Sequence, residues 1–455
     1  MKKEKGVLEK IYEWDYFPFI FMFLVYFIGH CILFRWIGDD VSCVAGYSEG
    51  SLLGHLQNVL IPNSWTSRIL INYVIAPLIF RMASYSAIWW CVVDSFFWVL
   101  IELSIFKIIY RLFGIRNRNT ISIIAGVLLS YPLIEMCSAG WIATTCSYLW
   151  TTSIGIWVLS NYIEGLFVHK AWWKYIIYCI ALVFAVNIEG GAIFFSILFI
   201  VLFLMEVFNK KIRWGTVCCA IISVGGICWH YFSAGNQKRV LSEIAYNFKN
   251  YAMLSFVDRL ELTVSRFVFN YILNYNTIFI IFSIFLLMAV RERCKDTFYR
   301  IVGAIPFIIT VLFGVVGKLG LYSELAIGGS LSKEGAITVD NYNHFSSYIS
   351  VVLGIVVCLC ILISFYVILN QYNHVILAAS IFLGGLGSWM VMIFSPTIWA
   401  SCARPFTTLN FVFLGLTIWL ASLVSNTKEK NKKIVQCIVW AFALCNIFNG
   451  LYIKY

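Results

Sequence analysis

Charged residues are scarce in this chain. Asp, Glu, Lys and Arg make up only 12% of its 455 residues, whereas soluble domains carry about 25%. Hydrophobic residues make up 61%. So few charges cannot cover the surface of a water-soluble fold of this size, which excludes an ordinary globular enzyme.

Metal-binding patterns and a cleavable leader are also missing. The six histidines are isolated from one another, and no Cys-x-x-Cys pair occurs among the fifteen cysteines, so no zinc site is indicated. A secretory signal peptide would have a shorter apolar region and a small-residue cleavage site. We therefore expect the first apolar run, 17–37, to be retained as a helix.

The chain has instead many apolar runs of about 20 residues, the length that an α-helix needs to cross a bilayer. This pattern predicts an all-α, polytopic membrane protein with about thirteen transmembrane helices, in which residues 1–455 form a single integral membrane domain. The predicted spans are 17–37, 87–109, 119–135, 145–163, 173–187, 190–208, 212–232, 271–290, 301–321, 346–369, 374–394, 406–425 and 433–453.

The basic residues predict the topology of these spans. If the N-terminus is cytoplasmic and the spans alternate, most of the 33 lysine and arginine residues fall in short cytoplasmic segments, as the positive-inside rule requires. We therefore predict a multi-pass protein of the cell membrane with its C-terminus outside. The net charge of +11 is then a topology signal, and we expect membrane lipids and no nucleic acid as partners.

Three long outer loops follow from this topology: 38–86, 233–270 and 322–345. The first two contain apolar-rich stretches too short to span, so we expect interfacial helices in both. The third is polar and glycine-rich at its start, and we expect it to be a mobile lid.

Unusual polar residues gather on the outer face. Asp39 and Asp40 directly follow the first span, where an acidic pair is conspicuous in so apolar a chain. Six other polar and aromatic residues fall on the same face, although the spans were placed from apolar runs alone. These residues are Arg68, Glu135, Tyr148, Trp150, Glu189 and Arg404.

These residue types suit group transfer from a lipid phosphate. A carboxylate can deprotonate an acceptor hydroxyl or hold a divalent cation, so Asp39 and Asp40 are the predicted catalytic residues. Arginines bind phosphate through charge-assisted hydrogen bonds and can neutralise a phosphate leaving group. The other six residues are predicted to bind substrate. Whether a cation binds at Asp39 and Asp40 stays open.

Two further acids, Asp94 and Glu102, lie within the second predicted span. Ionisable groups at such depth are costly. The sequence leaves open whether they form a buried polar pairing or a relay.

The chain resembles the GT-C superfamily of integral membrane glycosyltransferases, in particular the bacterial branch that decorates O-antigens and cell-wall polysaccharides. The resemblance lies in the acidic motif of the first outer loop, the Asn-x-x-x-x-Arg stretch at 63–68, Tyr148-Leu149-Trp150, and Ser395-Pro396 followed by Arg404.

The resemblance implies that one carboxylate of Asp39 and Asp40 is the catalytic base or its metal-binding partner, and that Arg404 binds donor phosphate. The donor would be a polyprenyl-phosphate-linked sugar. The large C-terminal soluble domain of oligosaccharyltransferase-type members is not seen, which favours a cell-surface glycan or a lipid-linked acceptor over protein.

Two other classes of membrane protein are alternatives to a glycosyltransferase. A transporter or lipid-linked oligosaccharide flippase would use deep ionisable residues, for which Asp94 and Glu102 are the clear candidates. A polysaccharide polymerase would use basic residues of the long outer loop 233–270, namely Lys238, Arg239, Lys249, Arg259 and Arg266.

Overall fold

Every regular element of the structure is a helix in the part of the chain that the computed structural model describes. That part comprises residues 16–48, 66–115, 117–132, 141–166, 171–316, 337 and 342–452. The prediction of an all-helical fold is therefore confirmed for these residues. Each of the thirteen predicted ranges overlaps a helix.

Eight helical segments in the described ranges are long and apolar enough to cross a membrane. A ninth results if Phe256–Leu273 and Thr277–Arg293, bent by 73°, count as one broken span. The other predicted spans correspond to the shorter apolar helices Phe17–Leu33, Arg118–Leu129 and Trp172–Ala185, or to the long helix Ala87–Phe113. The eight segments are Ile142–Gly165, Glu189–Phe208, Trp214–Phe232, Thr297–Gly314, Ile349–Ile368, Tyr372–Phe394, Arg404–Ser425 and Glu429–Gly450.

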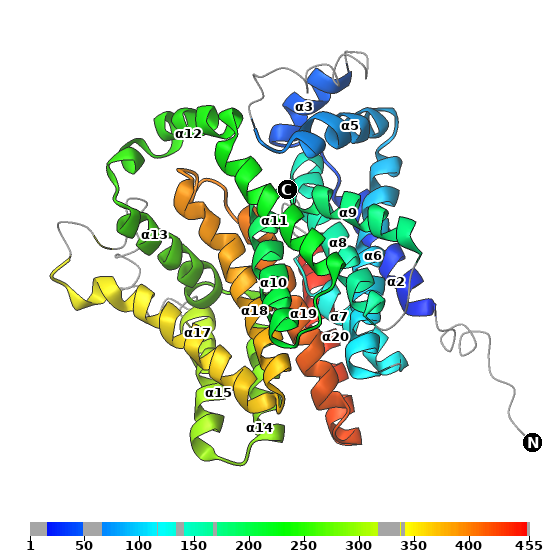
Figure 1. Cartoon of the computed structure of the whole chain (residues 1–455), viewed down its shortest axis with the longest axis vertical. Helices are drawn as coiled ribbons and strands as arrows, with labels where there is room; N and C mark the ends of the chain where they lie inside the picture. Colours follow the sequence, from blue (N-terminus) through cyan, green and yellow to red (C-terminus); the bar gives the residue numbers. More distant parts are fainter. Residues whose placement is uncertain are drawn as a thin grey trace, which may run out of the picture.

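The long helices pack side by side into one bundle (Figure 1). Within it, α19 is central because most of its side chains are buried, whereas α11 leaves many apolar side chains exposed. The bundle helices are α2 (Phe17–Leu33), α6 (Ala87–Phe113), α7 (Arg118–Leu129), α8 (Ile142–Gly165), α9 (Trp172–Ala185), α10 (Glu189–Phe208), α11 (Trp214–Phe232), α14 (Thr277–Arg293), α15 (Thr297–Thr310), α17 (Ile349–Ile368), α18 (Tyr372–Met390), α19 (Thr407–Ser425) and α20 (Glu429–Tyr452).

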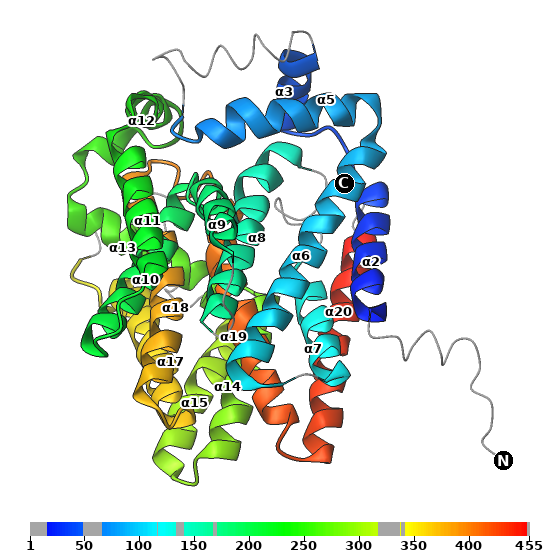
Figure 2. The ribbon, with the colours of Figure 1, turned by 45° about the vertical axis from the view of Figure 1, so that its right-hand side comes forward.

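Short helices cover one end of the bundle, where α5 and α12 run across the direction of the long helices (Figures 1 and 2). They occur in the two loops where interfacial helices were predicted. The short elements are α3 (Asp39–Ser48), η1 (Leu70–Ile75), α5 (Ala76–Tyr85), α12 (Ala234–Asn247), η2 (Lys249–Met253) and α13 (Phe256–Val268). The predicted lid, 322–345, lies outside the described residues except for 337 and 342–345.

Candidate functional site

A glycine turn places the acidic pair. Gly38 connects α2 to α3 with a φ of +55°, a backbone conformation that glycine adopts readily and other residues rarely do. A Cβ at this position would also come within 2.1 Å of the Trp141 ring. The chain can therefore turn beneath Trp141, and begin α3 with both aspartates, only because residue 38 has no side chain.

Asp40 anchors α3 to α8. Its carboxylate is fully buried and accepts hydrogen bonds from the backbone N–H groups of Ile142 at 2.7 Å and Ala143 at 3.0 Å. Those N–H groups belong to the first turn of α8, where they have no acceptor within the helix. The N-cap residue Trp141 makes no side-chain hydrogen bond to them. Asp40 therefore supplies the acceptor, and its negative charge is favourable at a helix N-terminus. Burial raises the pKa of Asp40 to about 6 against the opposing effect of these hydrogen bonds.

Asp39 faces the other way. Its side chain is 67% exposed, and its Oδ2 lies 3.6 Å from Nη1 of Arg404. Arg404 begins the short helix η8 (Arg404–Phe406) and is oriented by donating from Nε to the Ser401 carbonyl at 3.3 Å. The structure thus brings together the predicted base and the predicted phosphate-binding arginine, from opposite ends of the sequence.

A second polar cluster joins three other predicted residues. Arg68 contacts Oε2 of Glu189 through Nε at 3.0 Å and through Nη2 at 2.9 Å. Its Nη2 also donates to the Tyr148 hydroxyl at 3.4 Å, and its guanidinium carbon lies 5.2 Å from the centre of the Tyr148 ring. Both charged side chains retain less than a fifth of their exposure, so the cluster is tightly enclosed but reachable.

Residues that the sequence reasoning missed hold Arg68 in place. The Ser67 hydroxyl bonds to Nδ1 of His230 at 2.7 Å, and Nε2 of His230 lies 2.9 Å from the Val186 carbonyl. Because only Nε2 can donate to that carbonyl, Nδ1 accepts from Ser67. Trp229 and Asn236 bond to the Ser67 backbone. A histidine at the end of an apolar run was the only signal for this support.

Helix α8 connects the two clusters. The backbone N–H of Ala143 donates to the Asp40 carboxylate. Tyr148 lies five residues further along the helix, which corresponds to a rise of about 7.5 Å. Both α3 and η8 contact α8, and the Tyr148 hydroxyl contacts Arg68. The Asp39–Arg404 pair and the Arg68–Glu189 pair therefore flank the same end of one helix.

Trp150 lies in the interior instead of in this cluster. Its side chain is 3% exposed, its indole donates to Oδ1 of Asp94 at 2.6 Å, and its ring stacks on Phe97 at 4.2 Å between centroids. The other Asp94 oxygen lies 2.7 Å from Nε2 of His30, an ion-pair distance without hydrogen-bond alignment. In this arrangement Asp94 of α6 connects His30 of α2 with Trp150 of α8.

The remaining predicted residues divide as follows. Glu135 lies outside the described residues. Asp94 does not pair with Glu102, since its partners are His30 and Trp150. Glu102 is fully buried, and its two oxygens have no hydrogen-bond partner among the described residues.

A cation at Asp39 and Asp40 gains no support from the geometry, because both Asp40 oxygens already accept backbone N–H groups.

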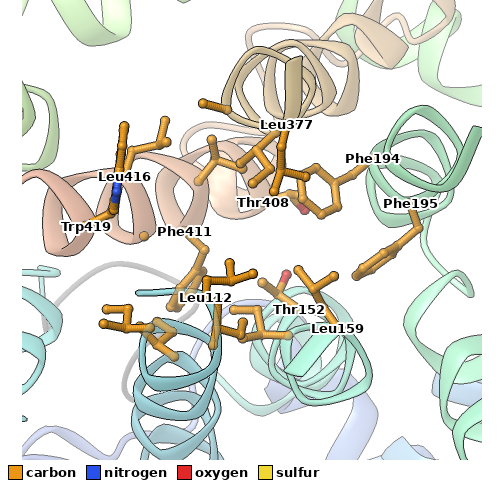
Figure 3. A pocket seen from close by; sticks show the side chains of 18 of the residues that line it. Leu112, Thr152, Leu159, Phe194, Phe195, Leu377, Thr408, Phe411, Leu416 and Trp419 are labelled. Atoms are coloured by element: carbon orange, nitrogen blue, oxygen red, sulfur yellow. The ribbon is translucent and has the colours of Figure 1, made fainter. Parts of the chain in front are cut away.

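An apolar cavity of about 180 Å³ begins one helical turn beyond the polar clusters. Thr151 and Thr152 follow Tyr148 on α8, Gly191 follows Glu189 on α10, and Thr408 follows Arg404. The lining then extends along α19 from Thr408 to Trp419, about 16 Å of helix. Figure 3 shows side chains of five helices pointing into it: Leu112, Thr152, Leu159, Phe194, Phe195, Leu377, Phe411 and Leu416 among them.

Comparisons with known proteins gave no match: no family model, no curated protein and no solved structure is significantly similar to this chain.

Proposed function

We propose that this protein is a membrane glycosyltransferase of the GT-C type, which moves a sugar from a polyprenyl-phosphate donor to a cell-surface glycan or lipid-linked acceptor. The observation that carries the proposal is the exposed Asp39 carboxylate beside Arg404, directly above an elongated apolar cavity. A carboxylate, a guanidinium and an apolar channel in that order match the three parts of such a reaction: acceptor hydroxyl, phosphate and lipid chain.

The donor is bound at both of its ends. Arg404 offers its guanidinium to the phosphate, and Thr408, one turn further, already lines the cavity. An isoprenoid chain attached to that phosphate would therefore continue along α19 into an almost wholly apolar space. Burying apolar surface stabilises such binding by about 25 cal/mol for each Å² removed from water.

Asp39, and not Asp40, is the catalytic base in this proposal. Asp39 is exposed, so an acceptor hydroxyl can approach it, whereas Asp40 is buried and both of its oxygens accept N–H groups of α8. Asp39 takes the proton of the acceptor hydroxyl, whose oxygen bonds to the anomeric carbon of the donor sugar. The bond from that carbon to the phosphate oxygen breaks, and its electron pair remains on the phosphate, where Arg404 stabilises the charge.

The sugar of the donor lies against the second cluster. Glu189 can accept hydrogen bonds from sugar hydroxyls while Arg68 compensates its charge, and the Tyr148 ring offers an apolar face for stacking. The pair is close to neutral as a unit. It therefore orients a neutral sugar without competing with Arg404 for the phosphate.

The proposed topology has about thirteen spans, with a cytoplasmic N-terminus and the site on the extracytoplasmic face of the cell membrane. The positive-inside pattern supports it, and the crosswise helices α5 and α12 beside the site are suited to the membrane interface. Leu241, Tyr246 and Met253 leave more than two thirds of their surface exposed there.

The test is glycan analysis of cells that express full-length protein with Asp39→Asn, with Glu243→Gln as a control carboxylate elsewhere on the outer helices. We expect Asp39→Asn to abolish one glycan modification at unchanged protein level, and Glu243→Gln to retain it. Unchanged glycan with Asp39→Asn would contradict the proposal.

A polysaccharide polymerase remains the second candidate, because the basic residues of 233–270 include Arg266, which stacks on Trp399 in the segment before Arg404, and Arg259, which stacks on Tyr251. Loss of a polymerase would shorten the polymer, whereas loss of a transferase would remove a sugar and leave polymer length unchanged. A flippase would instead move labelled lipid-linked sugar across liposomes.

A further inference from the structure

Two arginines of α13 rest on aromatic rings instead of on acids. The Arg259 guanidinium carbon lies 4.4 Å from the centre of the Tyr251 ring. That of Arg266 lies 4.6 Å from the centre of a Trp399 ring and 5.3 Å from that of Phe269. Stacking of this kind holds the plane of a guanidinium. Nη2 of Arg259 also donates to the Tyr251 carbonyl at 3.3 Å.

Neither arginine is neutralised by an acid within the described ranges. Arg68 and Arg404 each have a carboxylate within 4 Å, whereas Arg259 and Arg266 have none among the described residues. The Nε of each is buried there without a hydrogen-bond partner. Buried donors without partners cost free energy, so these two sites are built to receive an acceptor group.

Both arginines are connected to the segment that leads to the proposed donor site, Arg266 by direct contact and Arg259 through Tyr251. They are seven residues apart, which places them on one face of α13 about 10 Å from each other. Tyr251, beneath Arg259, donates its hydroxyl hydrogen to the Ile393 carbonyl, and Arg266 stacks on Trp399. The segment 393–404, which ends at Arg404, therefore contacts Arg266 directly and Arg259 through Tyr251.

We propose that Arg259 and Arg266 form a second anion site, which binds a phosphate or diphosphate group carried by the acceptor. This inference deepens the proposed function and rests on it, because it defines the acceptor as a phosphate-bearing molecule. Two sources share that chemistry: a glycan linked to a lipid through diphosphate, and a polymer with phosphate esters along its chain.

The first experiment measures binding of inorganic pyrophosphate to the purified full-length protein by calorimetry. We expect two sites in the wild type, of which Arg404→Gln removes one and Arg259→Gln/Arg266→Gln removes the other. Each single glutamine substitution on α13 should weaken that second site by about tenfold or more, since a hydrogen bond to a charged group is worth at least this factor.

Two control variants test whether the loss of binding results from unfolding or from a nonspecific loss of positive surface charge. Arg266→Lys keeps the charge but loses the planar fork, so it should retain weakened binding in a folded protein. Lys249→Gln removes an exposed charge from the adjoining helix η2 and should leave both sites unchanged. Two undiminished sites in Arg259→Gln/Arg266→Gln would overturn the inference.

The source of the phosphate is tested with two ligands. A long-chain polyprenyl diphosphate in nanodiscs and a soluble poly(ribitol phosphate) are each offered to the wild type and to the double variant. Whichever ligand loses affinity in the double variant is the acceptor class, and equal affinity of both proteins for both ligands would contradict the site.

Failure of this inference is distinguishable from failure of the proposed function. If Asp39→Asn abolishes glycan modification while the double variant retains both pyrophosphate sites, the transferase stands and the second anion site falls. If Asp39→Asn leaves the glycan unchanged while the double variant loses one site, the anion site stands without the transferase.

Discussion

The Asp40 carboxylate accepts a hydrogen bond of 2.7 Å from the backbone N–H of Ile142, 102 residues further along the chain. Through this contact the first outer helix, α3, is attached to the first turn of α8. The neighbouring residue Asp39 is thereby held at the surface facing Arg404. Two adjacent aspartates thus have different surroundings: Asp40 holds α3 on α8, and Asp39 is the base in the proposed reaction.

Replacing Asp40 should destabilise the protein. Asp40→Ala leaves the N–H groups of Ile142 and Ala143 buried without an acceptor, which should lower the free energy of unfolding by about 1.5–3 kcal/mol. Asp40→Asn retains one oxygen acceptor and should cost less than half of that. Thermal unfolding of the purified protein measures both, and equal melting temperatures for the alanine variant and the wild type would contradict this role.

Stability should depend on pH through Asp40. Burial raises the pKa of its carboxyl from 3.8 to about 6, so the folded protein holds a proton that the unfolded chain has released. The resulting stabilisation is complete below about pH 4 and is lost as the pH rises through 6. Melting temperatures between pH 4 and 7 should therefore fall less in Asp40→Asn than in the wild type. Parallel curves would show that Asp40 does not titrate in this range.

Gly38→Ala should disrupt the site. The added Cβ meets the Trp141 ring, and the left-handed conformation costs a non-glycine residue about 1 kcal/mol in addition. We expect a lower melting temperature and loss of the glycan modification. Gly29→Ala is the matched control, because its Cβ would have nothing within 4 Å and alanine favours the helix. Unchanged activity of Gly38→Ala would refute the positioning role of this turn.

Filling the cavity should weaken binding of long-chain donors. Leu377→Trp extends a lining side chain into the space, whereas Leu383→Trp changes an exposed position of the same helix, α18. We expect the KM for a long polyprenyl-phosphate sugar to rise about tenfold in Leu377→Trp, which is the effect of losing about 1.4 kcal/mol of binding. A donor with a short chain should be affected little. Equal KM changes for both donors would indicate a different location for the chain.

Arg68 and Glu189 should behave as a coupled pair. Arg68→Met leaves the enclosed Glu189 without its counter-ion, and Glu189→Met does the reverse, so each single change should destabilise by several kcal/mol, about 3–5 by analogy with buried ion pairs. The double variant should be more stable than either single one. Measured melting temperatures of the four proteins complete the cycle, and additive effects would show that the pair is not coupled.

Much of the fold could be predicted from the sequence because apolar runs of helical length report burial in lipid or protein directly. Each predicted range overlaps a helix. Apolarity does not reveal how long each helix is: α7, which overlaps the predicted span 119–135, runs from Arg118 to Leu129 and has only 12 residues. The number of crossings was therefore less predictable than the class.

The candidate site was predictable as a set of residues but not as an arrangement. Asp39, Arg68, Tyr148, Glu189 and Arg404 form two clusters that flank α8. The sequence had no means to separate Trp150, whose indole turns inward to Asp94, from Tyr148 two residues before it. Nor could it identify His230, whose partners Ser67 and Val186 come from distant segments.

By itself the sequence indicated a helical protein with many apolar helices of membrane-spanning length, since composition and hydrophobic periodicity are properties of the chain alone. Only the tertiary structure decided which aspartate is exposed and which is buried. Adjacent residues at the start of a helix point in different directions, and the N–H groups of Ile142 and Ala143 lie on one side of α3 while Arg404 lies on the other. Those partners are more than 100 residues away, so no local pattern could reveal them.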